Sequence, residues 1–195
     1  MSEHRIVLVG ADTMWRKNVK AMLSKYGYWV VGEAGDGVSA LKMVRSRQPD
    51  LLIIDAALQS MDGFQVAKIV NEDKLAPVIA TADASFQGVM EKAKEAKVFS
   101  LLFKPIIESS LLPAIELALT NYQEIASLEK QIKELQDTLE TRKLVERAKG
   151  ILTETLGLTE AEAFRRMQRQ SMNKRVSMRV IAEAVIMSQS LKTKK

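Results

Sequence analysis

Three polar side chains of different chemistry each follow a short apolar run in the first half of the chain. Asp55 comes after one run, Thr81 after a second within Ala80-Thr81-Ala82, and Lys104 after a third within Phe103-Lys104-Pro105. If these runs are parallel strands, their carboxyl ends meet at one edge of a sheet, where doubly wound folds bind their ligands. A hydroxyl donor and an ammonium charge beside a carboxylate are suited to contact anionic oxygens. The three positions together predict a chemical site.

The elements that must position this site alternate between apolar runs and amphipathic stretches. Helical patterns end near Tyr26 and Arg47 and begin near Phe64 and Phe86. Because parallel crossovers place helices over both faces of a sheet, the pattern predicts an α/β fold with a doubly wound (βα)5 parallel sheet, flavodoxin-like in type. The five predicted strands are residues 6–9, 29–31, 51–54, 78–80 and 98–103.

After Pro105 the pattern becomes entirely helical and carries a heptad seam. Its a and d positions are spaced alternately by four and three residues, which predicts that the fifth helix continues as a coiled coil in a parallel homodimer. The alternative is a helix that packs only on its own chain. The seam consists of Ala114, Ala118, Asn121, Ile125, Leu128, Ile132, Leu135 and Leu139.

Beyond Leu139 the apolar phase shifts, which indicates a second core. Gly157 is placed to end the first helix, Thr159 and Glu162 form a capping box for a second, and Ser177 can cap a third. We therefore expect a small three-helix bundle. The predicted boundaries are 1–121 for the first domain, 122–140 for the coiled coil and 141–195 for the bundle with a basic tail.

Charge separates the two halves of the chain. Residues 1–140 hold 16 Lys and Arg against 19 Asp and Glu, a net charge of −3, whereas residues 141–195 hold 13 against 5, a net charge of +8. A compact basic domain attracts polyanions, most often nucleic acid, although a solvated charged face is the alternative. The absence of cysteine excludes disulfides and thiolate metal sites, and a single histidine cannot form a cluster. With neither a signal peptide nor an apolar span, we expect a cytoplasmic protein.

Residues 5–120 resemble the receiver domain of two-component response regulators. The resemblance rests on Asp55, the loop Met61-Asp62-Gly63, Thr81 and Lys104. It implies that Asp55 accepts a phosphoryl group from a sensor histidine kinase with the help of Mg²⁺, and that Thr81 and Lys104 contact the phosphoryl oxygens.

The sequence departs from the receiver pattern after the first strand. Receivers carry an acidic pair there, but this chain has Gly10 and Ala11, so the expected metal ligands are Asp55, Ala57 and the displaced Asp12. Mg²⁺ requires near-octahedral oxygen ligands, which one displaced carboxylate supplies poorly. The aromatic residue common on the fifth strand is Leu101 here.

Residues 124–188 resemble the ANTAR domain. The resemblance rests on RKLVERAKGIL at residues 142–152 and GLTEAEAF at residues 157–164. It implies binding of paired hairpins in a nascent leader transcript and hence transcription antitermination. Phe164 is the only aromatic residue of this domain and is expected in its core, so the expected RNA contacts are cationic. They are Arg142, Lys143, Arg147, Lys149, Arg165, Arg166, Arg169, Lys174, Arg175 and Arg179.

Two other functions fit parts of the sequence. Short capped helices with arginines also describe a DNA-binding helix-turn-helix. A receiver without its acidic pair could instead serve as a phosphorylation-independent dimerisation module. An enzyme is not expected, because no nucleophile and base pair is found outside the predicted site.

Overall fold

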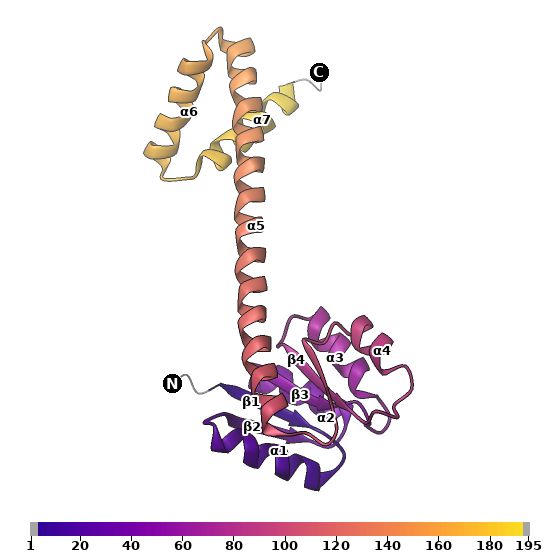
Figure 1. Ribbon diagram of the computed structural model, residues 1–195. Helices are drawn as coiled ribbons and strands as arrows, with labels where there is room; N and C mark the ends of the chain where they lie inside the picture. Colours follow the sequence, from indigo (N-terminus) through magenta and orange to yellow (C-terminus); the bar gives the residue numbers. More distant parts are fainter. Residues whose placement is uncertain (1–3, 193–195) are drawn as a thin grey trace. The chain divides into compact units, whose positions relative to one another are not determined.

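The computed structural model describes residues 4–192. The chain forms two compact units, one up to Ile125 and one from Ala126 onward (Figure 1). Residues 193–195 of the predicted basic tail lie outside the described residues.

The first unit contains a five-stranded parallel sheet. Its strand order is β2-β1-β3-β4-β5. The chain thus adds β2 on one side of β1 and then adds β3, β4 and β5 on the other side, so the strand order switches between β1 and β3. This switch opens a crevice at the carboxyl ends of the central strands. The strands are β1 (Arg5–Val9), β2 (Trp29–Ala34), β3 (Leu51–Asp55), β4 (Val78–Ala82) and β5 (Ser100–Phe103).

Helices cover both faces of the sheet, as the hydrophobic pattern predicts. Successive residues of a strand point to opposite faces, so Ile6 and Leu8 join one apolar layer and Val7 and Val9 the other. The first layer is closed by α1 and the start of α5, and the second by three helices. The four helices confined to this unit are α1 (Thr13–Lys25), α2 (Gly37–Arg47), α3 (Gly63–Glu72) and α4 (Val89–Glu95).

Several element boundaries differ from the prediction. Strand β2 continues to Ala34, β5 begins at Ser100, and α4 begins at Val89 rather than near Phe86. Phe86 lies in a turn closed on Asp83, and its ring packs edge-on against Phe64 with centroids 5.8 Å apart. Its apolar character thus reflects core packing before the helix and not the first turn of the helix.

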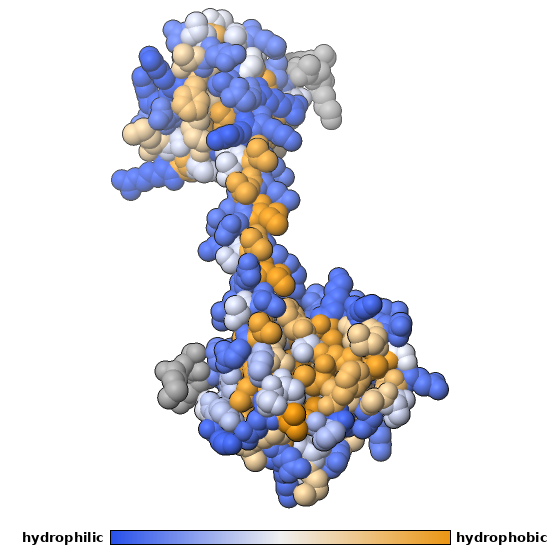
Figure 2. Space-filling view, viewed as in Figure 1, coloured by the Kyte–Doolittle hydropathy of each residue, from blue (hydrophilic) through white to orange (hydrophobic). Residues whose placement is uncertain are grey.

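Helix α5 (Glu108–Leu156) is 49 residues long and continuous. The predicted boundaries at 121 and 140 both fall inside it and stay predictions. Ala114 and Ala118 are buried in the first unit, but the apolar seam beyond them is exposed in the single chain (Figure 2). The exposed fractions are Ile125 46%, Leu128 50%, Ile132 54%, Leu135 65% and Leu139 56%.

The end of α5, α6 (Glu160–Lys174) and α7 (Met178–Lys192) form the predicted three-helix bundle. Thr159 and Glu162 make both hydrogen bonds of the capping box, and Gly157 adopts the left-handed conformation with φ 65°. The buried core residues are Val145, Ala148, Met167, Ile181 and Ala182.

Candidate functional site

The fold brings the three predicted side chains together at the carboxyl ends of β3, β4 and β5. Asp55 and Thr81 are neighbours across the paired strands, and the Lys104 ammonium lies 2.7 Å from Oδ2 of Asp55. Asp55 is 2% exposed and Thr81 is fully buried. The Thr81 hydroxyl has no hydrogen-bond partner among the described residues. The site therefore combines a buried, paired carboxylate with a free hydroxyl donor.

Close backbone packing fixes the position of Asp55. A Cβ on Gly63 would lie 2.1 Å from the Asp55 carbonyl oxygen, so only glycine allows α3 to begin so near β3. The Ala57 N–H donates to Oδ1 of Asp55 at 3.3 Å, close to the outer limit of a hydrogen bond. These contacts hold one carboxylate oxygen toward the loop and leave the other facing Lys104.

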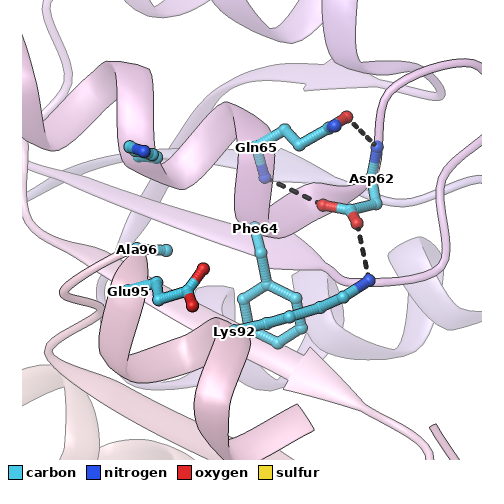
Figure 3. Close-up of a pocket in the computed structure, with 7 residues that line it drawn as sticks. Asp62, Phe64, Gln65, Lys92, Glu95 and Ala96 are labelled. Carbon is cyan, nitrogen blue, oxygen red and sulfur yellow. Dashed lines mark hydrogen bonds and ion pairs between the residues drawn. The ribbon is translucent and has the colours of Figure 1, made fainter. Parts of the chain in front are cut away.

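A shallow pocket lies beside this loop, between α3 and α4 (Figure 3). Asp62 forms a capping box with Gln65, and its carboxylate lies 3.1 Å from the Lys92 ammonium. Lys92 also lies 5.0 Å from the centroid of the Phe86 ring. Lys92, one of the two lysines that line the pocket, already has both a carboxylate and a ring as neighbours, and we assign the pocket no ligand.

Three residues at the main site were not predicted from the sequence. Asp83 lies 3.6 Å from the Lys104 ammonium, and the Trp15 ring centroid lies 5.8 Å from the same atom. Arg16 donates to the carbonyl oxygens of Gly10 and Ala11. Asp83 could have been predicted from the sequence, because it stands two residues after Thr81 at the end of β4. Trp15 and Arg16 lie within a helical pattern, and nothing in that pattern predicts a place at the site.

The metal ligands expected from the receiver resemblance do not assemble. Asp12 accepts a hydrogen bond from the Met14 N–H at 2.8 Å and caps α1, so its carboxylate has a structural role. Gly10 and Ala11 offer no side-chain oxygen. Within residues 4–192, no three acidic or histidine side chains gather as a metal site would require. The residues around Asp55 therefore do not fit Mg²⁺, which needs several oxygen ligands in near-octahedral geometry.

The ten predicted RNA-contacting cations fall into two groups. Two of them are paired with carboxylates. The Lys149 ammonium lies 2.9 Å from Glu146, and this hydrogen bond raises the pKa of Lys149. Arg179 lies 3.0 Å from Glu183, and this hydrogen bond raises the pKa of Arg179. The other eight are exposed and make no ion pair within residues 4–192. These eight, which we call the open cations, are Arg142, Lys143, Arg147, Arg165, Arg166, Arg169, Lys174 and Arg175.

The prediction for Phe164 was wrong. Its side chain is 42% exposed, while Ala163 and Met167 on the same helix are buried. Helix α6 packs against only two other helices, the end of α5 and α7. The buried face of α6 is therefore too narrow to include Phe164. Hydrophobic side chains are consequently exposed over α6, flanked by hydrophilic ones (Figure 2). An aromatic ring is thus available at the surface beside Arg165.

Comparison with known proteins agrees with this organisation. Residues 6–116 match the response regulator receiver domain and residues 133–186 match the ANTAR domain. The chain is 38% identical over 182 residues to the transcriptional regulatory protein PdtaR of Mycobacterium tuberculosis, covering 93% of this chain and 89% of that protein.

Two further relatives match little more than half of the chain. The chain is 30% identical over 113 residues to the chemotaxis protein CheY of Bacillus subtilis, covering 57% of this chain and 94% of that protein. It also resembles the receiver domain of the putative response regulator NarL from Mycobacterium tuberculosis, with a TM-score of 0.58, 24% identity, and coverage of 62% of this chain and 98% of that one. This last likeness shows the fold. The chain therefore belongs to the response regulators in which a receiver domain is followed by an ANTAR domain, which act as RNA-binding antiterminators.

Proposed function

We propose that this protein binds paired hairpins of a nascent leader RNA as a homodimer and thereby prevents a terminator from forming. The observation that carries the proposal is the set of open cations, because exposed cations that make no ion pair within residues 4–192 are free to contact phosphates. Phe164 adds a ring on which an unpaired loop base can stack.

The exposed seam of α5 supports a parallel dimer. The a positions hold Ile125, Ile132 and Leu139, and the d positions hold Leu128 and Leu135. Isoleucine at a with leucine at d favours two parallel strands. These side chains are about half exposed in the single chain, so a second copy would remove a continuous apolar stripe from water.

The receiver supplies control in this proposal. The buried pair of Asp55 and Lys104 supports a phosphoryl-accepting role for Asp55, in which the unpartnered Thr81 hydroxyl donates a hydrogen bond to an added oxygen. The input is either phosphoryl transfer from a sensor kinase to Asp55 or the binding of a protein partner. In both cases the output is a change in dimerisation of the ANTAR domains.

A cytoplasmic location would allow access to nascent transcripts. Within residues 4–192 no helix is sufficiently long and apolar to cross a bilayer.

The proposal is tested by binding of the full chain to a leader RNA with two hairpins, to the same RNA with one hairpin, and to duplex DNA of equal length. We expect the tightest binding to the two-hairpin RNA, and a dimer by analytical ultracentrifugation. Preference for duplex DNA would favour the helix-turn-helix alternative. Comparison of wild type with Asp55→Asn, each with and without acetyl phosphate, separates phosphoryl control from partner control.

A further inference from the structure

The space beside Asp55 at the end of β1 is filled by an aromatic ring. A Cβ on Gly10 would lie 2.6 and 2.7 Å from two ring carbons of Trp15 and 3.5 Å from Cβ of Asp55. Trp15 is only 9% exposed and belongs to the apolar layer under α1, so its rigid indole has little room to move. An acidic side chain at position 10 is therefore incompatible with Trp15 as it is packed.

The charge of Asp55 is already compensated by the protein. The carboxylate is almost fully buried, and a buried charge without a partner is costly. Lys104 meets this need at 2.7 Å, and its ammonium lies 5.8 Å from the centroid of the Trp15 ring. An aromatic face near an ammonium is favourable. The Lys104 ammonium thus lies near the carboxylates of Asp55 and Asp83 and the indole of Trp15.

The loop after β1 presents a cation where metal ligands would be needed. The Arg16 guanidinium donates to the carbonyl oxygens of Gly10 and Ala11, the second at 3.3 Å. Its Nε lies 3.6 Å from a carboxylate oxygen of Glu33, which further fixes the side chain. The two backbone oxygens nearest the missing acidic pair are therefore engaged, and a positive charge stands beside them.

We propose that this receiver is a metal-independent module, in which Trp15, Arg16 and Lys104 take over the space and the charge that Mg²⁺ would supply. It follows that Asp55 does not undergo Mg²⁺-dependent phosphorylation and that partner binding, of the two inputs considered above, controls the dimer. The inference deepens the proposed function, but its test needs no RNA and can therefore fail separately.

The test is calorimetric titration of the full chain with Mg²⁺, together with Trp15 fluorescence in a Trp29→Phe variant, which leaves a single emitting indole. Trp29 is 59% exposed, so its replacement leaves the core intact. The matched variant combines Gly10→Asp, Ala11→Asp and Trp15→Ala, which together restore two carboxylates and the room for them. Circular dichroism checks that each variant is folded.

For the wild type we expect neither binding heat nor a fluorescence change at millimolar Mg²⁺, and no phosphorylated Asp55 by intact mass after treatment with acetyl phosphate. The triple variant should gain saturable Mg²⁺ binding. Saturable binding or phosphorylation of the wild type would overturn the proposal, and this result is decisive even if the triple variant fails to fold. A folded triple variant that binds no Mg²⁺ would refute the role assigned to Trp15 and the missing acidic pair. RNA binding, measured on the same samples, reports separately on the proposed function.

Discussion

At the scale of single residues, the ANTAR domain exposes two kinds of group that recognise RNA differently. In the proposed function, the open cations contact phosphates through charge, which every nucleic acid offers and which salt weakens. The exposed ring of Phe164 can instead stack on a base that has left the helix, which only loops and bulges offer. The two contributions can be separated by substitution.

Phe164→Ala should weaken binding of a hairpin with an unpaired loop. Base stacking on an aromatic side chain contributes roughly 1–3 kcal/mol, so the dissociation constant should rise about 5- to 150-fold. Fluorescence anisotropy at fixed salt measures the change. Phe164→Trp is the control and should retain the affinity, and an unchanged melting temperature of the alanine variant would exclude unfolding. Equal affinity of Phe164→Ala and wild type would contradict a stacking role.

Arg169→Ala should lower the salt dependence of RNA binding. Arg169 is an open cation, and each phosphate contact contributes roughly 0.7–0.9 to the slope of log affinity against log salt. Lys149→Ala is the matched control, because Lys149 is occupied by Glu146 and Glu160. We expect the slope to fall for Arg169→Ala only. Equal slopes for the two variants would show that pairing in the free protein does not decide which cations contact RNA.

At the scale of elements, the start of α6 depends on an ionised glutamate. The Thr159 N–H donates to the Glu162 carboxylate at 2.9 Å, and this bond holds the pKa of Glu162 below its ordinary value. A lowered pKa means that the folded state favours the ionised form. The stabilisation is therefore present above the pKa of an unfolded glutamate, about 4.3, and is lost as the pH falls through the folded value.

Glu162→Gln tests this charge, because glutamine keeps an acceptor but does not titrate. We expect the melting temperature of the variant to lie below that of the wild type at neutral pH, and the difference to shrink as the pH falls below about 4.3 and to vanish below the folded pKa of Glu162. Thermal unfolding followed by circular dichroism measures both. Glu154→Gln, at an exposed glutamate of α5, should show no such convergence. A difference that persists unchanged in acid would mean that the ionised form is not responsible.

The sequence determined most of the fold but less of the site. The apolar strand runs, the helical spacing of α5 and the Thr159 capping box act locally, so each could be predicted from neighbours in the chain. That Asp55, Thr81 and Lys104 lie close together could be predicted, because the carboxyl ends of parallel strands meet at one edge of the sheet. The packing of Trp15 against Gly10 depends on how closely α1 approaches β1, and the exposure of Phe164 depends on how much of α6 two other helices cover. Neither is encoded by spacing along the chain.

The charges beside the seam of α5 allow a test of whether the two helices of the dimer run parallel. In a parallel two-stranded coil, Glu124 at a g position faces Glu129 at the following e position of the partner, which places like charges together. Glu129→Lys should convert these contacts into attractions and lower the dimer dissociation constant several-fold, since exposed pairs contribute up to about 1 kcal/mol each. Glu134→Lys, at an outward c position, is the control. Sedimentation equilibrium measures both, and a weaker Glu129→Lys dimer would contradict the parallel register.

At the scale of the whole molecule, the proposed dimer turns two weak RNA contacts into one strong one. A single small domain with exposed cations gains modest affinity, much of which is lost at physiological salt. When two such domains share one dimer, the second hairpin binds intramolecularly, which can raise affinity by roughly 10²- to 10⁴-fold without a new contact. Control of dimerisation by the receiver is then equivalent to control of RNA binding.

Leu135→Asp tests this coupling. Leu135 is a d residue that is 65% exposed in the single chain, so the substitution should abolish the dimer while leaving the fold of each chain intact. We expect affinity for a two-hairpin RNA to fall about 100-fold or more, to the value for one hairpin, while single-hairpin affinity stays unchanged. Ser127→Asp adds the same charge at an outward c position and should alter neither. If Leu135→Asp is monomeric yet keeps its preference for two hairpins, the preference must come from the RNA fold and not from pairing of the ANTAR domains.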